Sequence, residues 1–110
     1  MKQKDIYLAD LNPTKKNEQS GIRPVVIISG DTMNDNLGIV IVCPLTSSIK
    51  NYTGTVFVGK NQKNKLKSDS EILVFQIRAI SQKRLIKKVG RITDIEFKTI
   101  LNSLSEILFF

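Results

Sequence analysis

The chain has 110 residues, 41% of them hydrophobic, which supplies enough apolar surface for one core and predicts a single domain over residues 1–110. Seventeen Lys and Arg against ten Asp and Glu give a formal net charge of +7, which favours a polyanionic partner. No stretch approaches the roughly 20 apolar residues of a membrane span, and no apolar signal core follows the first lysines, so we expect a cytoplasmic protein that contacts no membrane.

The first quarter of the chain predicts two strands joined by a long loop. Residues 5–11 should form a strand that ends before Asn12 and Pro13. Residues 12–22 are polar and make a loop of about ten residues, longer than the usual connection of about four to six, which favours a functional loop. Residues 25–28 are all β-branched and follow Arg23 and Pro24, so they predict a strand buried on both faces.

A polar connector and two further strands are expected next. Residues 31–36 have room for one helical turn, and residues 39–43 predict a third strand that ends at Pro44. The single cysteine, Cys43, lies in this apolar run, so we expect a buried and inert thiol. Residues 55–58 are also typical of a strand.

The last part of the chain combines a basic loop, two strands and a helix. Residues 59–68 are rich in lysine and predict a mobile, solvated loop. Residues 71–80 predict one strand that presents Gln76 and Arg78 on one face, and residues 89–92 a short last strand. Thr93 and Glu96 have the spacing of a capping box, and the helix that follows places its apolar side chains on one face: Phe97, Ile100, Leu101, Leu104, Ile107 and Leu108.

Five or six short strands and one terminal helix define the expected fold class. We predict a mostly β, α+β fold, namely a small, mostly antiparallel barrel with the helix packed on it. The apolar face of the helix should belong to the core or to a dimer interface.

Composition removes several kinds of catalytic site. A chain with no histidine and one cysteine has no zinc site, no Ser/His/Asp triad and no histidine pair for acid/base work. The acids are scattered, and the one close pair, Asp31 and Asp35, fits a turn or a cap better than a magnesium site. We therefore expect no metal and no cofactor. Catalysis would rest on Arg, Lys, Thr, Ser and isolated carboxylates.

The positive charge is concentrated in one stretch. Between residues 36 and 93 there are eleven basic and two acidic residues, a net +9, whereas the remainder has six basic and eight acidic residues, a net −2. Such a field attracts a nucleic acid with a strong dependence on salt.

RNA is a substrate that this limited set of side chains could cleave. Each ribose carries a 2′-hydroxyl that can attack the adjacent phosphate once it is deprotonated and aligned. The enzyme must then stabilise charge on the phosphorus and move two protons. Arg23 is positioned for the first task, because a guanidinium can meet two phosphate oxygens at once. A surface charge or an ion-pair partner is the alternative interpretation of Arg23.

Four segments in order resemble the successive motifs of the MazF/PemK family. They are DIYLADLNPTK at residues 5–15, EQSGIRPVVIIS at 18–29, CPLTS at 43–47 and QIRAI at 76–80. With the basic loop and the terminal helix, the resemblance covers essentially the whole chain. It implies an SH3-like barrel of the CcdB/PemK type, a homodimer with single-stranded RNA in a groove across the subunits, and a cognate antitoxin, for which we expect an acidic tail.

The resemblance also implies an activity and a set of site residues. The activity is sequence-specific, metal-independent cleavage of RNA that leaves a 2′,3′-cyclic phosphate and a 5′-hydroxyl. Arg23 matches the family's catalytic arginine, which we expect to stabilise phosphorane charge, and Thr46 matches the threonine of the P-x-T motif. Glu18 is a candidate for removing the 2′ proton. The expected substrate-binding residues are Lys15, Lys16, Asn17, Glu18, Gln19, Ser20, Ser47, Gln76 and Arg78.

Two positions depart from the family pattern, and two other functions compete. Lys16 stands where a glycine is usual, and Asn17 stands where some relatives have a histidine, which bears on base selectivity. The first alternative is a non-enzymatic toxin of the same barrel that inhibits DNA gyrase, as CcdB-type proteins do. The second is an inactive relative that only binds nucleic acid.

Overall fold

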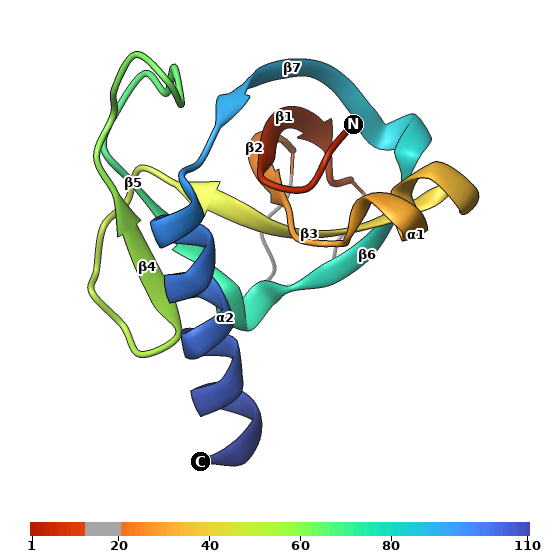
Figure 1. Ribbon diagram of the computed structural model, residues 1–110. Helices are drawn as coiled ribbons and strands as arrows, with labels where there is room; N and C mark the ends of the chain where they lie inside the picture. Colours follow the sequence, from red (N-terminus) through yellow and green to blue (C-terminus); the bar gives the residue numbers. More distant parts are fainter. Residues whose placement is uncertain (13–20) are drawn as a thin grey trace.

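Seven strands form one antiparallel sheet in the computed structural model, which describes residues 1–12 and 21–110 (Figure 1). In chain order they are β1 (Asp5–Asp10), β2 (Ile22–Ile27), β3 (Ile39–Thr46), β4 (Thr55–Val58), β5 (Ser70–Leu73), β6 (Arg78–Ser81) and β7 (Leu85–Arg91). The order in the sheet is β4-β5-β3-β2-β1-β7, and β6 also pairs with β3. The predicted class is confirmed, with seven strands where five or six were expected. Within the described ranges no pairing joins the end strands β4 and β7, so the barrel is not closed.

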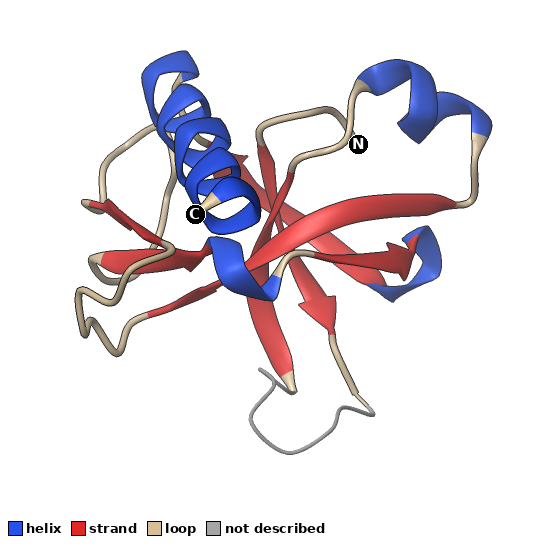
Figure 2. Ribbon diagram, turned by 90° about the horizontal axis from the view of Figure 1, so that it is seen from below, coloured by secondary structure: helices blue, strands red, loops and turns tan. Residues whose placement is uncertain are grey.

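Two helices and two short 3-10 turns complete the fold: α1 (Asp31–Asn36), η1 (Val74–Gln76), η2 (Gln82–Arg84) and α2 (Asp94–Phe109). Figure 2 shows α2 on one side of the sheet and α1 at a distance from it. The predicted helical turn at residues 31–36 is confirmed. None of the helices in the described part of the chain is long and apolar enough to cross a bilayer.

Strand β2 is buried on both faces, as its run of β-branched residues predicts. Val25 and Ile27 pack into one apolar cluster with Val40 and Val42 of β3. Val26 belongs to the second cluster, which also contains Ile100 of α2 and has Phe97 and Leu104 packed against it. Strand β2 is therefore packed between two apolar clusters, and its first residues, Ile22 and Arg23, lie outside both clusters.

The terminal helix begins as the sequence predicts, but it buries only part of its apolar face. The Thr93 hydroxyl accepts a bond from the Glu96 backbone N–H (3.1 Å), and the Glu96 carboxylate accepts one from the Thr93 N–H (2.8 Å). The second half of the helix extends away from the sheet (Figure 1). Five apolar residues of the whole helix are exposed by 37% or more: Ile95, Leu101, Ile107, Leu108 and Phe109.

The single strand predicted over residues 71–80 is wrong, because η1 interrupts it. Leu45 of β3 pairs with Ile72 of β5, and Val42 of β3 pairs with Arg78 of β6. The two paired positions are three residues apart on β3 but six residues apart on the chain that pairs with it. The three residues of η1 take up this difference. Their turn is fixed by the Gly54 carbonyl, which accepts bonds from the backbone N–H groups of residues 74 and 75. Gln76 therefore lies in a 3-10 turn, and it does not share a strand face with Arg78.

The prediction that Pro44 ends the third strand is also wrong. Strand β3 continues to Thr46, and Pro44 pairs with Val25 of β2. On its other side β3 pairs with β6 up to Val42 and with β5 from Leu45 onward, so Pro44 lies in the gap between the two partners. The missing N–H of proline removes no ladder bond at such a gap. The last strand likewise starts earlier than residue 89, at Leu85.

The basic loop of residues 59–68 exposes its four lysines to solvent, as expected, and its own hydrogen bonds give it a defined conformation. Asn64 is fully buried, and its side chain donates to the Gly59 carbonyl and accepts bonds from the backbone N–H groups of Asn61 and Leu66. Gly90 of β7 lies against the same turn, where an added Cβ would overlap the Asn64 carbonyl. The loop is thereby fixed onto the end of β7, and its lysines project from a defined base.

Candidate active site

Arg23 and Thr46 lie at the same level of two neighbouring strands and on the same face. Val25 of β2 pairs with Pro44 of β3. Arg23 lies two residues before Val25, and Thr46 lies two residues after Pro44. Side chains two residues apart on a strand share a face, and the antiparallel register brings the two positions opposite each other. Both side chains are half-buried, and both line one cavity. Two residues distant in sequence thus line one cavity at the end of the buried strand β2.

The Thr46 hydroxyl is oriented by the turn that follows it. Its oxygen accepts a bond from the Ser48 backbone N–H (3.1 Å), which leaves the hydroxyl hydrogen available as a donor. Ser47 is exposed and lines the same cavity as Thr46. The end of β3 therefore presents two neighbouring hydroxyl groups beside Arg23.

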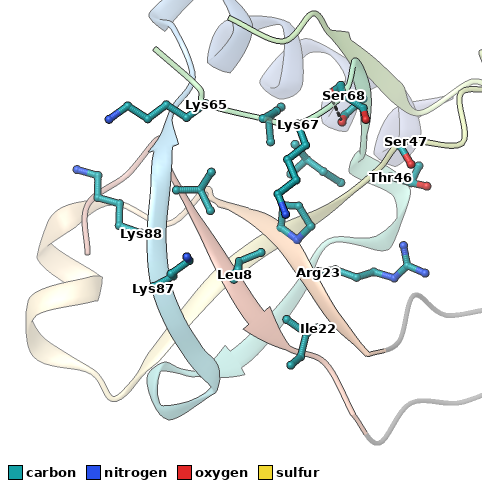
Figure 3. A pocket seen from close by; sticks show the side chains of 15 residues that line it. Leu8, Ile22, Arg23, Thr46, Ser47, Lys65, Lys67, Ser68, Lys87 and Lys88 are labelled. Carbon is teal, nitrogen blue, oxygen red and sulfur yellow. Dashed lines mark hydrogen bonds between the residues drawn. The ribbon is translucent and has the colours of Figure 1, made fainter. Parts of the chain in front are cut away.

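The cavity next to these residues has a volume of about 570 Å³ and combines an apolar floor with a cationic wall. Leu8, Pro24 and Leu45 contribute to the floor. Among the described residues, the charged side chains that line the cavity are basic: Arg23, Lys65, Lys67, Lys87 and Lys88. Figure 3 shows Arg23, Thr46 and Ser47 at one side, Lys65, Lys87 and Lys88 at the other, and Lys67 between them. The spread of these cations along the cavity suits an extended anion better than a single phosphate.

The sequence interpretation missed the roles of Lys87 and Lys88. Their charge was part of the basic stretch, but the strand was expected to begin after them, at residue 89. The structure places them on β7, which pairs with β1 beside the cavity floor at Leu8↔Lys87. Lys88 is partly neutralised, because its ammonium lies 3.5 Å from the buried carboxylate of Asp5. Lys87 also lines the cavity and contributes to the positive charge of its β7 side.

A second cavity of about 370 Å³ meets the first at Thr46. Its lining includes Tyr52, Gln76 and Glu71. The Glu71 side chain is buried, and burial alone raises the pKa of a carboxyl group. Bonds from the N–H groups of residues 50 and 51 and from the Thr55 hydroxyl outweigh burial, so the pKa of Glu71 is lowered and the group stays ionised.

The other expected site residues fall into three places. Arg78 pairs with Val42, which puts it on the sheet face of Thr46, but it lines neither cavity. Gln76 lines the second cavity with Thr46. Six predicted residues lie outside the described residues: Lys15, Lys16, Asn17, Glu18, Gln19 and Ser20.

The loop that carries these six residues starts and ends beside the site. The Leu11 backbone N–H donates to the Gly21 carbonyl (3.0 Å), and the Gly21 N–H donates to the Asn12 side chain (3.0 Å). The Arg84 guanidinium also donates to the carbonyl groups of Asp10 and Asn12. Both ends of the loop are therefore held together, two residues before Arg23.

Cys43 takes no part in the site. The thiol is fully buried, and desolvation raises its pKa to about 12, so it stays protonated at neutral pH. The expectation of a buried, inert cysteine is confirmed in its burial. The described residues also contain no group of three or more acidic or cysteine side chains arranged to hold a metal ion.

Known proteins share both the sequence pattern and this fold. The family described as PemK-like, MazF-like toxin of type II toxin-antitoxin system matches residues 2–108. The Endoribonuclease MazF of Staphylococcus saprophyticus is 41% identical over 105 residues, which cover 94% of this chain and 88% of the relative. The crystal structure of MazF from Deinococcus radiodurans aligns with a TM-score of 0.87 at 20% identity, over 100% of this chain and 97% of the other. A mycobacterial endoribonuclease in complex with its cognate antitoxin aligns with a TM-score of 0.80 at 19% identity, over 98% and 94%.

The antiparallel sheet and the single terminal helix define a small, mostly β toxin fold, with a cationic cavity at the end of β2. The family match extends over nearly the whole chain, and the curated relative is well above 30% identical. The chain therefore belongs to the PemK-like, MazF-like toxin family of type II toxin-antitoxin systems, and its enzyme class is that of the endoribonucleases.

Proposed function

We propose that this protein cleaves single-stranded RNA at a specific sequence without a metal ion, through attack by the substrate's own 2′-hydroxyl. The observation that carries the proposal is the placement of Arg23 and Thr46 at the same level of neighbouring strands, beside a cavity whose charged lining is basic throughout residues 1–12 and 21–110. An RNA backbone needs such a surface, and the cleaved phosphate needs a fork of donors at one point of it.

The reaction divides between substrate and protein. The 2′-oxygen bonds to phosphorus, the bond from phosphorus to the 5′-oxygen breaks, and the products are a 2′,3′-cyclic phosphate and a free 5′-hydroxyl. In our proposal the Arg23 guanidinium stabilises the charge on the phosphorane oxygens, because it does not readily give up a proton. Thr46 donates a hydrogen bond to a phosphate oxygen. Glu18 is our candidate for accepting the 2′ proton, and a second group returns a proton to the leaving oxygen.

The substrate strand in this proposal follows the groove around the site. Ser47, Gln76 and Arg78 lie on the described part of that path or beside it. The loop from Asn12 to Gly21 supplies the rest of the expected contacts: Lys15, Lys16, Asn17, Glu18, Gln19 and Ser20. Base selectivity would then depend on side chains of this loop, including the departures at Lys16 and Asn17.

We also propose the partners that such a toxin requires. An antitoxin with an acidic, partly disordered tail would compete with RNA for the basic cavity. The mycobacterial relative in complex with its antitoxin supports this class of partner. We further propose that the protein acts in the cytoplasm as a homodimer, with RNA across the two subunits.

The test is cleavage of long unstructured RNA by the purified protein in excess EDTA, with mapping of the 5′-hydroxyl ends. We expect discrete cuts at one short sequence, and we expect Arg23→Ala to lose the activity with an unchanged circular dichroism spectrum. Arg23→Lys is the matched control, because it keeps the charge without the planar fork and should retain only a small part of the rate.

A folded protein that leaves such RNA intact contradicts the proposal. Inhibition of gyrase supercoiling by that same protein would instead identify the non-enzymatic toxin. Binding of RNA without turnover, unaffected by Arg23→Ala, would identify an inactive relative.

A further inference from the structure

We propose that the second cavity, next to Thr46, holds one unstacked base of the RNA strand, with the ring of Tyr52 as its stacking surface. This inference rests on the proposed function and adds a recognition site to it. Its volume of about 370 Å³ is in the lower range of ligand pockets, as one base with its ribose requires.

The position of the cavity relative to the catalytic pair is the first argument. Thr46 lines both cavities, so a strand whose phosphate contacts Thr46 has its neighbouring nucleotide at the opening of the second cavity. The first cavity is lined by four lysines and suits the backbone. The second is lined by two aromatic rings, an amide and several hydroxyl groups, together with one lysine and the Glu71 carboxylate. Because that carboxylate is engaged by donors of the protein, the rings and the neutral polar groups make the cavity suited to a base.

Exposed aromatic rings are the second argument. The Tyr52 side chain is 60% exposed and that of Phe75 is 46% exposed, and both line this cavity. Exposed rings of this kind are the usual stacking surfaces for single-stranded RNA, because every base has a face to stack.

The rigid support of Tyr52 is the third argument. The buried Glu71 carboxylate accepts bonds from the N–H groups of Lys50 (2.8 Å) and Asn51 (3.0 Å). The Thr55 hydroxyl oxygen lies within hydrogen-bond distance of both the Glu71 carboxylate (3.0 Å) and the Tyr52 carbonyl oxygen (2.7 Å). A buried charge thus fixes the backbone on both sides of an exposed ring. A fixed ring binds a base with less loss of conformational freedom than a mobile one.

The polar lining supplies the means to distinguish bases. The Gln76 amide has both donors and an acceptor, and the Ser48 hydroxyl can do either. Side chains of this kind read the edges of bases that are splayed out of a strand. Stacking on Tyr52 would supply affinity for any base, and these groups would supply the preference among bases.

The experiment is a double-mutant cycle between Tyr52 and individual bases. The RNA contains the mapped cleavage sequence, with hydrogen in place of the 2′-hydroxyl at the cut, so that binding is measured without reaction. Each flanking nucleotide is replaced in turn by an abasic one. For the wild-type protein we expect one abasic position to weaken binding by about five-fold to over one hundred-fold. Tyr52→Ala should weaken binding to intact RNA similarly, and the abasic change should then cost nothing more.

Two control variants separate stacking from other effects. Tyr52→Phe keeps the ring and should bind like the wild type. Phe109→Ala removes a ring that is 76% exposed at the end of α2 and lines neither cavity, so it should leave both binding and cleavage unchanged.

The inference would be overturned if Tyr52→Ala and the abasic substitution weakened binding independently, or if Tyr52→Ala bound RNA like the wild type. In either case, cleavage of RNA by the wild-type protein would leave the proposed function standing. Loss of dimerisation or of antitoxin binding by Tyr52→Ala, without loss of RNA affinity, would overturn it in favour of a protein contact. A wild-type protein that cleaves no RNA overturns both proposals.

Discussion

At the scale of single residues, the site depends on which groups are satisfied by the protein and which are left for a substrate. The Thr46 hydroxyl oxygen accepts a hydrogen bond from the Ser48 N–H, and this bond leaves the hydroxyl hydrogen available as a donor. The Glu71 carboxylate is instead fully engaged by the protein and stays buried. The first residue is therefore suited to contact RNA, and the second to hold a loop in place.

Replacing Thr46 by valine tests the hydroxyl at nearly constant shape. We expect Thr46→Val to lower the single-turnover cleavage rate by about 10²-fold or more, because one preorganised donor to the transition state is removed. Thr46→Ser is the matched control and should stay within about ten-fold of the wild type. Wild-type cleavage by Thr46→Val would show that the residue serves only the end of the strand.

Replacing Glu71 by glutamine tests the anchor of the turn through its pH dependence. The pKa of Glu71 is lowered in the folded protein, so its carboxylate stabilises the fold above the unfolded value of about 4.3 and loses this effect as the pH falls through the folded value. At pH 7 we expect Glu71→Gln to lower the free energy of unfolding by about 1–3 kcal/mol. The glutamine NH2 group would face the N–H groups of Lys50 and Asn51, and two donors cannot form a hydrogen bond with each other.

This difference between wild type and Glu71→Gln should shrink when urea unfolding is repeated below about pH 4. Glu106→Gln is the control, because Glu106 lies exposed on α2 and should change stability little at either pH. A difference that stays constant with pH would mean that shape, and not charge, holds the turn.

At the scale of elements, close packing between β7 and the basic loop decides where the lysines lie. Gly90 has no room for a side chain, since a Cβ would lie within 2.6 Å of the Lys63 carbonyl oxygen and closer still to that of Asn64. The buried Asn64 side chain then closes the loop on itself. Lys65 and Lys67 follow directly and reach the cavity.

Replacing Gly90 by alanine should therefore disturb both stability and substrate binding. We expect Gly90→Ala to lower the free energy of unfolding by about 1–3 kcal/mol, as overpacking does, and to weaken RNA binding by displacing the loop. Gly59→Ala is the matched control in the same loop, where the nearest atom to a Cβ is 3.7 Å away. Equal stability of the two variants in urea would contradict the tight contact.

At the scale of the whole molecule, the charge distribution is directed towards one cavity. The excess positive charge lies between residues 36 and 93, and four lysines from two separate segments of that stretch line the same cavity as Arg23. Converging cations of this kind bind a polyanion mainly through release of its counterions, so affinity falls steeply as salt rises.

The salt dependence of RNA binding measures how many of these cations take part. For a single strand, each phosphate contact contributes about −0.7 to the slope of log K against log salt concentration. We expect Lys87→Ala to reduce the magnitude of this slope by about 0.7, whereas Lys98→Ala, on α2 and outside both cavities, should leave it unchanged. An unchanged slope for Lys87→Ala would place the RNA away from β7.

Much of the fold was predictable because its causes are local in sequence. The capping box of Thr93 and Glu96, the helical turn at residues 31–36 and the doubly buried strand β2 all follow from spacing and residue type. The prediction failed at Pro44 and at residues 71–80. There the structure depends on which strands pair with β3, and a partner is not visible in the segment itself.

The sequence by itself determined most of the elements and the sign and amount of charge, because propensity and periodicity are properties of short segments, and its resemblance to the family made Arg23 and Thr46 candidates. Only the tertiary structure decided that these two side chains share a face, that Lys87 joins them at one cavity, and that the buried Glu71 supports Tyr52 beside them. These relations come from strand register, and register is fixed by the burial of two apolar cores that residues from the whole chain build together.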